Sequence, residues 1–167
     1  LTATTSGDTT TVDYNVKNNG RGPTIAEVIR ENKDGLPVSW KVTGATTFGS
    51  KVDEQFTQAG AKANWTDSTG KGQARLTRPG LYVTQSGSPW ADQIYLRALL
   101  KAPDHTLPAL PGGTLRLEKG ETLKVTGDGG PLEVTRYDLG GIDLTPTTIL
   151  VDGAGDLFAE VSPDSIL

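Results

Sequence analysis

Short runs of alternating apolar and polar residues, each closed by a turn signal, constrain the fold of this chain more than any other feature. In the run Thr9–Lys17, every second residue from Val12 to Val16 is apolar, which is the period of a half-buried β-strand. Lys33-Asp34-Gly35 separates two such runs and is a strong hairpin signal. This pattern predicts a mainly β chain in which sequential strands pair antiparallel.

The alternating runs fall into two series. The first is a meander over residues 9–84, with strands expected at Thr9–Lys17, Thr24–Asn32, Val38–Thr43, Ser50–Gln58, Ala61–Trp65, Gln73–Arg78 and Leu81–Thr84. The second is a meander over residues 114–161, with strands expected at Thr114–Glu118, Thr122–Thr126, Leu132–Leu139, Thr147–Asp152 and Leu157–Val161. We expect about 10–11 strands in one curved antiparallel sheet or half-barrel.

One helix is expected between the two series, over residues 89–101. Ser88 is a good N-cap, and the proline that follows it suits the first helical position. Ile94 and Ala98 lie at helical spacing, as do Tyr95 and Leu99, so one apolar stripe can pack against the sheet. The helix is expected to end before Pro103.

Residues 102–113 are rich in proline and connect the helix to the second series. They could be a linker between domains. Because five short strands alone would make a marginal domain, we interpret them as a crossover within one domain that spans residues 1–167.

Composition excludes several classes of function. The 167 residues carry a net charge of −4, which argues against a protein held by nucleic-acid phosphates. No apolar run is longer than three residues, the length of Ile149-Leu150-Val151, so no segment is expected to span a membrane. The chain has no Cys and one His, which leaves no thiolate chemistry and no multi-histidine metal site. Having no Met, it reads as a processed product or a piece of a longer chain.

The titratable residues offer no convincing catalytic set. His105 lies in the Pro-rich connection without a local nucleophile or carboxylate partner, so we interpret it as a surface loop residue. Asp53 and Glu54 are adjacent in a strand and must point to opposite faces. Asp138 and Asp143 flank a Gly-Gly turn, and an acid pair drawn from distant strands stays open.

Glycine-rich and aromatic residues have structural interpretations as well. Asp152-Gly-Ala-Gly-Asp156 resembles a calcium loop but lacks alternating ligands and a closing Glu, so a hairpin turn is favoured. Gly127-Asp128-Gly129-Gly130 and Gly20-Arg21-Gly22 precede no helix and read as turns, not phosphate cradles. The dispersed aromatics are interpreted as core, with a sugar-stacking face as the alternative: Trp40, Trp65, Trp90, Tyr14, Tyr82, Tyr95 and Tyr137. Asn64-Trp65-Thr66 fits a glycosylation sequon.

Several turn and strand motifs together resemble a known family. They are Lys17-Asn-Asn-Gly-Arg-Gly-Pro23, Asp34-Gly-Leu-Pro-Val38 with Val42-Thr-Gly44, Val52-Asp-Glu-Gln-Phe56, Gly87-Ser-Pro89 and Gly155-Asp-Leu-Phe-Ala-Glu-Val-Ser-Pro163. In this order they resemble the β-rich N-terminal region that precedes the catalytic barrel in exported bacterial amidohydrolases, the imidazolonepropionase-like metal-dependent hydrolases. The expected half-barrel is also similar to the lipoprotein-carrier folds of the bacterial envelope.

The resemblance implies a function without implying any site residue. In that family the metal lies in a following (β/α) barrel with a His-x-His motif, which this chain does not contain. The chain would then be a non-catalytic accessory domain, periplasmic or extracellular, whose partner is the downstream catalytic domain of the same polypeptide. The alternative is an envelope carrier or binding module that holds an apolar ligand between sheet and helix. No catalytic, cofactor-binding or metal-binding residue, and no cofactor, is assigned to this chain.

One further expectation concerns the surface. If a partner domain is missing, one face or edge of the sheet should be less polar than a monomer's surface normally is. The apolar pair Ile166-Leu167 could be the first contact with that domain, or could fold back into the core.

Overall fold

The computed structural model describes residues 1–127 and 129–161. Within these residues it contains thirteen β-strands in two antiparallel sheets and one α-helix, which confirms the mainly β class and the half-barrel. The chain divides into two compact units, Leu1–Ala91 and Asp92–Leu167, which we call unit 1 and unit 2 and describe separately. The single domain expected from the sequence stays a prediction.

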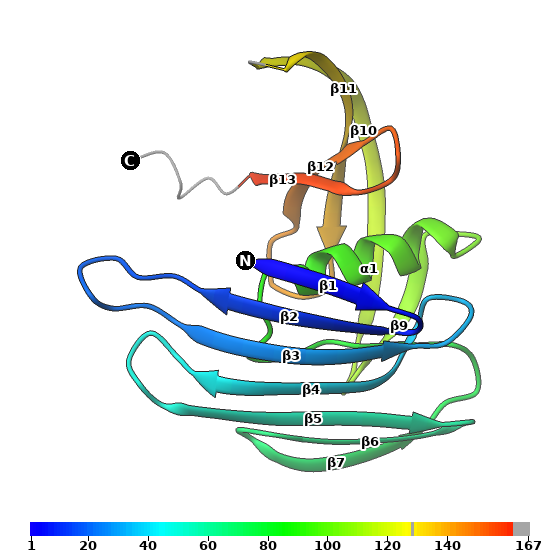
Figure 1. Cartoon of the computed structure of the whole chain (residues 1–167). Helices are drawn as coiled ribbons and strands as arrows, with labels where there is room; N and C mark the ends of the chain where they lie inside the picture. Colours follow the sequence, from blue (N-terminus) through cyan, green and yellow to red (C-terminus); the bar gives the residue numbers. More distant parts are fainter. Residues whose placement is uncertain (128, 162–167) are drawn as a thin grey trace. The chain divides into compact units, whose positions relative to one another are not determined.

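Seven strands of unit 1 form one meander in which every neighbour in sequence is a neighbour in the sheet (Figure 1). Each pair is antiparallel. The strands are β1 (Thr2–Ser6), β2 (Thr9–Asn15), β3 (Thr24–Glu31), β4 (Pro37–Ala45), β5 (Lys51–Ala59), β6 (Lys62–Asp67) and β7 (Gly70–Arg75). A two-residue strand, β8 (Leu81–Tyr82), follows in the same unit.

One face of the seven-stranded sheet is buried because the apolar residues of neighbouring strands are in register. Ile29, Trp40 and Phe56 form one row across β3, β4 and β5 and are fully buried. Gly44 lies on the same sheet with φ of +140°, and a Cβ there would meet the Thr24 carbonyl. Only glycine therefore allows the close approach of β3 and β4 at this point.

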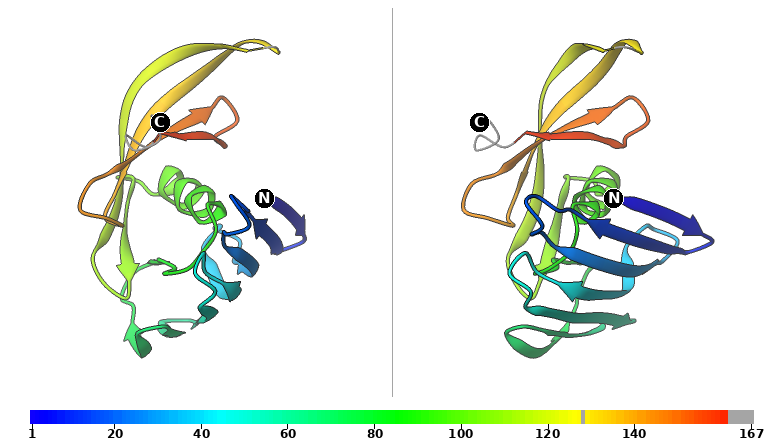
Figure 2. Two further views of the ribbon diagram at one scale, coloured as in Figure 1. Left: turned by 90° about the vertical axis from the view of Figure 1, so that its left-hand side faces the viewer. Right: turned by 60° about the vertical axis from the view of Figure 1, so that its left-hand side comes forward.

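Unit 2 contains most of the helix and a second antiparallel sheet. Its strands run in the order β13-β12-β11-β10-β9. They are β9 (Thr106–Leu110), β10 (Thr114–Gly127), β11 (Gly130–Gly140), β12 (Thr147–Asp152) and β13 (Leu157–Val161). The β10–β11 hairpin is much longer than its neighbours, and it bends along its length in both views of Figure 2.

A β-bulge divides the β10–β11 hairpin into two halves. Lys119 pairs with Tyr137 but Thr122 pairs with Thr135, so β10 contains one extra residue at this point. Because side chains alternate between faces, an extra residue moves the apolar residues of β10 to the other face. Leu117 and Leu139 therefore share one face in the proximal half, whereas Leu123 and Val134 share the opposite face in the distal half.

The helix α1 (Trp90–Lys101) has the start and the buried stripe that the sequence predicts. The Trp90 backbone N–H donates to Ser88 Oγ at 3.3 Å, which confirms Ser88 as the N-cap. Ile94, Ala98 and Leu99 are all buried.

Several predicted boundaries were wrong. The Pro-rich residues 102–113 contain a strand, β9, and 114–118 and 122–126 belong to the single strand β10. Residues 119–121, which separate the two expected strands, form no turn: Gly120 lies in the bulge, where a residue without a side chain is easily accommodated. The N-terminal strand β1, which is all Thr, Ala and Ser, was missed because it lacks an apolar alternation.

The turn between β6 and β7 is tight, since only residues 68 and 69 lie between the two strands. The Asp67 carboxylate accepts hydrogen bonds from the backbone N–H groups of Thr69, at 2.7 Å, and Gly70, at 3.2 Å. Strand β7 consequently begins at Gly70, earlier than predicted, and ends at Arg75.

Candidate functional site

Two glutamates lie on the buried face of the seven-stranded sheet. Glu27 in β3 and Glu54 in β5 both pair with Val42 of β4, so the three residues form one row. Each glutamate is only 2% exposed. Neighbouring strands lie about 4.8 Å apart, which places the two glutamate backbones about 10 Å from each other.

Both carboxylates bind groups of the segment that leads into the helix. Glu27 accepts hydrogen bonds from Trp40 Nε1 and from the Ser88 backbone N–H, each at 2.6 Å. Glu54 accepts from the Tyr82 hydroxyl at 2.8 Å and from the backbone N–H groups of Gln85, at 3.0 Å, and Ser86, at 3.1 Å. Every oxygen of the two carboxylates therefore accepts a hydrogen bond.

Burial raises the pKa of Glu54 above its usual range, while the hydrogen bonds from Tyr82, Gln85 and Ser86 lower it in part. The charge of Asp67 adds a smaller raising effect. The ring of Phe56, beside Glu54 in β5, stacks on Tyr82 with centroids 4.6 Å apart. This packing holds the donor hydroxyl in place, so the arrangement is suited to anchoring the segment 82–88.

Sequence reasoning missed Glu27, although a signal was present. Ile25-Ala-Glu27-Val-Ile29 and Val52-Asp-Glu54-Gln-Phe56 each place a glutamate in phase with apolar residues. That phase puts the carboxylate on the buried face. Asp53 lies on the other face, exposed, where the Lys51 ammonium at 2.7 Å lowers its pKa. The prediction that Asp53 and Glu54 point to opposite faces is confirmed.

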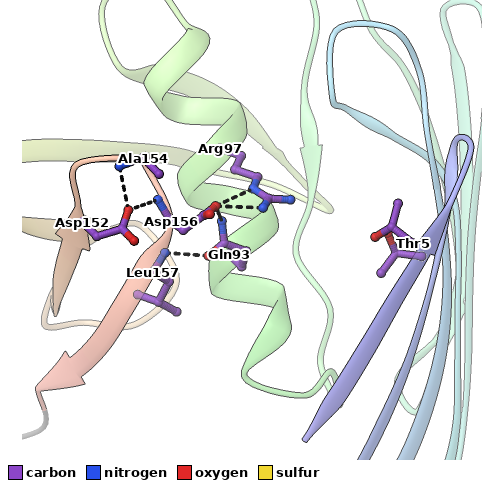
Figure 3. A network of polar contacts seen from close by, with 8 residues as sticks. Thr5, Gln93, Arg97, Asp152, Ala154, Asp156 and Leu157 are labelled. Atoms are coloured by element: carbon purple, nitrogen blue, oxygen red, sulfur yellow. Dashed lines mark hydrogen bonds and ion pairs between the residues drawn. The ribbon is translucent and has the colours of Figure 1, made fainter. Parts of the chain in front are cut away.

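A polar network in unit 2 joins the helix to the turn between β12 and β13 (Figure 3). Asp156 accepts hydrogen bonds from Arg97 at 2.8 Å and from Gln93 at 3.1 Å. The Leu157 backbone N–H donates to Gln93 Oε1 at 2.7 Å. Gln93 is buried, so this contact fixes the start of β13 against the helix.

The Asp152–Asp156 segment is the hairpin turn that was favoured over a calcium loop. The Asp152 carboxylate accepts from the backbone N–H groups of Ala154 and Asp156, and Asp156 is ion-paired with Arg97. Over residues 1–127 and 129–161, no group of three or more His, Cys, Asp or Glu side chains is arranged to hold a metal ion.

The distal half of the β10–β11 hairpin forms one side of an apolar groove. Val125 and Leu132 pair across the two strands, and Phe158 of β13 lines the groove with them. Pro131 and the backbone of Gly127, Gly129 and Gly130 complete it, and its volume is about 310 Å³. The bulge in β10 places Val125 on the same face as Leu132, so that both line the groove.

Asp92, in the first turn of α1, is affected by two other carboxylates, one in β13 and one in the loop before β12. Burial, and then the negative charges of Glu160 and Asp143, raise the pKa of Asp92 to about 6. Glu160 pairs with Ile149, whereas Phe158 projects into the groove on the other side.

The remaining candidates have structural roles. His105 is half-buried with φ of +51° in the turn before β9, and its carbonyl accepts from the Leu117 backbone N–H. It is less exposed than the surface loop residue expected, because it closes the connection between helix and sheet. Asp138 binds Arg136 and Thr148, while Asp143 is exposed.

The aromatic residues are largely core, as interpreted. Trp40, Tyr82, Tyr95 and Tyr137 are buried, whereas Trp65, Trp90 and Tyr14 are half-buried. The Trp65 ring lies directly over Gly72, where a Cβ would collide with it. Asn64, the first residue of the sequon, lies within strand β6.

Two predictions fall outside the described residues: Asp128 of the Gly-rich turn and the apolar pair Ile166-Leu167. Among the residues that are described, no helix has the length and apolarity required to cross a membrane.

Comparison with known proteins yields a fold and no family. No family model and no curated protein matches the chain. The fold is similar to that of a solved structure, a DUF1089 family protein from Pseudomonas aeruginosa, with a TM-score of 0.53. The match covers 96% of this chain and 88% of that one at 13% identity. DUF1089 denotes a domain of unknown function, so the similarity defines the architecture alone.

Proposed function

We propose that this chain is a non-catalytic accessory domain of an exported, metal-dependent amidohydrolase, and that its partner is the catalytic barrel of the same polypeptide. The link to amidohydrolases rests on the sequence motifs given above. The periplasmic or extracellular location is part of the same proposal and rests on the same resemblance.

The observation that carries the non-catalytic role is the state of the buried carboxylates. A general acid or base needs a free position from which to exchange a proton with substrate. Glu27 and Glu54 are the most buried acids of the described chain, and all four of their oxygens already accept hydrogen bonds from Trp40, Tyr82 and the segment 85–88. These hydrogen bonds hold that segment to the sheet.

The carrier function is the second candidate, and the apolar groove of unit 2 is the observation that favours it. Binding pockets for small ligands usually have volumes of about 300–1,000 Å³ and bury most of the ligand. The groove has about 310 Å³ and is open along one side, formed by one hairpin and one strand. It is therefore at the lower limit for a carrier, and the accessory domain is preferred.

The test first determines the full reading frame of the natural polypeptide that contains this chain. It then uses that polypeptide for the activity measurements. We expect a barrel with a His-x-His motif after residue 167, and hydrolysis of amide or ester substrates that requires the metal. Glu27→Gln and Glu54→Gln should change the thermal midpoint but leave kcat/KM per folded molecule within about twofold. Glu121→Gln, an exposed residue of β10, is the matched control.

Three results would overturn the proposal. One is hydrolysis, or one retained equivalent of zinc, by residues 1–167 alone. Another is loss of kcat in Glu27→Gln or Glu54→Gln at an unchanged midpoint. The third is a reading frame without a hydrolase barrel, together with stoichiometric micromolar binding of a fluorescent fatty acid that Phe158→Ser abolishes; that outcome would support the carrier.

A further inference from the structure

We propose that the outer face of β6 and β7 in unit 1 binds an extended acidic segment of a partner polypeptide through Lys62, Lys71 and Arg75, which we call the basic cluster. This is an interaction surface, and it does not depend on the amidohydrolase assignment. It follows from where these three cations lie, from the lack of a counter-charge for them, and from the direct opposition of two of them.

The basic cluster lies on the face of the seven-stranded sheet that is turned away from the core. Strands β6 and β7 are neighbours at the end of this sheet (Figure 1). Ala63 is buried and pairs with Ala74, so these two residues mark the inner face. Because side chains alternate along a strand, Lys62, Lys71 and Arg75 point outward, and all three are exposed.

The chain supplies no counter-charge for the basic cluster. With the residues that the structure describes, none of the three cations forms an ion pair or a side-chain hydrogen bond. Residues 55–91 contain four basic residues and a single acid, Asp67. Asp67 is buried, and its carboxylate accepts hydrogen bonds from two backbone N–H groups of its own turn. The charges of the cluster are therefore available to a partner.

Two cations of the cluster face each other across the strand pair. Lys62 and Arg75 are direct partners in the β6–β7 register, and like charges in such positions are destabilising. Basic residues on an edge strand prevent unwanted pairing, which accounts for Lys71 and Arg75 of β7. It does not account for Lys62, because β6 lies between β5 and β7. A carboxylate bound between Lys62 and Arg75 would remove their repulsion, so this pair is suited to bind an anion.

A hollow lies beside the opposed cations. It is lined by Lys62, Gln73, Ala74 and Arg75, and its volume is about 360 Å³. Gln73 is exposed and lies midway between Lys71 and Arg75 on the outer face of β7. Its amide group both donates and accepts hydrogen bonds, as a peptide backbone does. The hollow therefore offers cationic groups for a carboxylate and a neutral polar group for the chain that carries it.

The spacing of the cations sets the spacing of the acids that fit them. Lys71 and Arg75 are four residues apart on one strand, a separation of about 13 Å. An extended peptide projects every second side chain to the same side, so acids at positions i and i+4 are equally far apart. One carboxylate would then lie at Lys71 and the other between Lys62 and Arg75.

A single-stranded nucleic acid fits this face less well. Proteins that bind one without sequence preference stack its bases on aromatic side chains, and the outward residues of β6 and β7 include no aromatic. Trp65 of β6 is on the other face, since it pairs with the buried Phe56. An acidic polypeptide needs no stacking, only opposite charge at the right spacing.

The experiment measures binding of a labelled peptide with blocked ends, Glu-Ser-Thr-Ser-Glu, to residues 1–167 by fluorescence anisotropy. We expect saturable binding that is lost in about 0.5 M salt, because the charged contacts are screened. Lys-Ser-Thr-Ser-Lys should not bind. Ser-Glu-Glu-Ser-Thr has the same composition as the first peptide, but its adjacent acids point to opposite sides of an extended chain. It should bind about threefold more weakly or worse.

Substitutions in the basic cluster should weaken binding of Glu-Ser-Thr-Ser-Glu without unfolding the protein. We expect Lys62→Gln and Arg75→Gln each to raise Kd about threefold to fivefold, and the double variant about tenfold or more. Lys62→Arg keeps the charge and should stay within about twofold. Lys17→Gln removes the same charge from an exposed loop residue that follows β2, and it is the matched control that should also stay within about twofold.

The thermal midpoint of the free protein separates this role from a structural one. Lys62→Gln removes the like-charge contact with Arg75, so its midpoint should equal or exceed that of wild type. If Lys62 acted only to stabilise the sheet, the midpoint would fall.

Equal binding of the two acidic peptides, no binding at about 10 mM peptide, or a lower midpoint for Lys62→Gln would refute the proposal. So would a light-scattering mass that shows a dimer lost in the double variant, because a second copy would then be the occupant. Binding of a sulfated polysaccharide that the double variant loses, with no peptide binding, would assign the surface to an acidic polysaccharide instead.

Discussion

At the scale of single residues, two buried carboxylates show how this chain offsets the cost of removing charge from water. Desolvation of an ionised side chain is expensive unless hydrogen bonds replace those of water. Glu27 and Glu54 receive their donors from Trp40, Tyr82 and three backbone N–H groups of residues 85–88. The compensation is incomplete at Glu54, since burial still raises its pKa.

The raised pKa of Glu54 has a consequence for stability. Because the folded state binds the proton more tightly than the unfolded state, this group lowers the free energy of unfolding as pH rises from about 4.5 through the raised pKa. We expect wild type to lose stability relative to Glu54→Gln over that window. Urea unfolding at pH 4.5 to 8 measures the difference, with Glu121→Gln as control. A difference that is constant with pH would contradict the expectation.

The pKa of Asp92 is raised as well, again mainly by burial and then by the charges of Glu160 and Asp143. Its folded pKa of about 6, against an ordinary value of 3.8, means that its stabilising contribution is complete below pH 3.8 and is lost as pH rises through 6. Asp92→Asn should therefore raise the free energy of unfolding at pH 7.5, by up to about 3 kcal/mol, less about 0.5 kcal/mol for the lost charge at the helix N-terminus.

The control for Asp92 is Asp13→Asn, an exposed position on β2. Equilibrium unfolding of Asp92→Asn at pH 7.5 and at pH 4 separates the effect of the buried charge from that of the helix N-terminus. The gain in the free energy of unfolding at pH 7.5 should disappear at pH 4. If Asp92→Asn is less stable than wild type at pH 7.5, the folded protein ionises Asp92 at little cost in free energy.

At the scale of elements, the helix depends on its cap and on its buried stripe. Ser88 accepts from the Trp90 N–H through its side chain, and its own N–H donates to Glu27. Ser88 therefore caps the helix and is also hydrogen-bonded to Glu27 in the sheet of unit 1. The Gln93 and Arg97 side chains join the same helix to the β12–β13 turn in unit 2.

Truncation of the stripe should cost more than removal of the cap. Leu99→Ala should lower the free energy of unfolding by roughly 2–5 kcal/mol because Leu99 is fully buried. Ser88→Ala should lower it by about 1 kcal/mol, since the backbone contact with Glu27 remains. Leu144→Ala, at an exposed position, is the control and should change little. An unchanged urea midpoint for Leu99→Ala would show that the stripe is misplaced.

At the scale of the whole molecule, the question is whether the two compact units unfold together. The sequence predicts one domain, because neither the second series of strands nor the helix makes a large core alone. We expect a single calorimetric transition for residues 1–167, shifted to lower temperature both by Gly44→Ala in unit 1 and by Leu99→Ala in unit 2. Gly44→Ala should cost roughly 1–3 kcal/mol, because its φ of +140° is strained for alanine.

Two resolved transitions, each sensitive to only one of these substitutions, would show that the units are independent domains. Gly60→Ala is a control of the same type with open space around the Cβ, although its φ of +57° adds a small strain of its own.

The sequence by itself determined the class of fold, the antiparallel meander of residues 9–75, the start and stripe of the helix, and the structural nature of the Asp152–Asp156 turn. These are local properties: alternation of period two, turn residues and an N-cap act within a few positions of the chain, so the residue pattern is enough to reveal them.

Only the tertiary structure decided the division into two sheets, the continuity of β10 through its bulge and the partners of the buried glutamates. A bulge at Gly120 and a turn at Gly120 have the same sequence signature. The structure decides for the bulge, because Tyr137 and Thr135 of β11 lie opposite Lys119 and Thr122 of β10. Glu27 and Ser88 are 61 residues apart. Their hydrogen bond, and the apolar groove formed by Phe158 and Leu132, arise from contacts that no local pattern encodes.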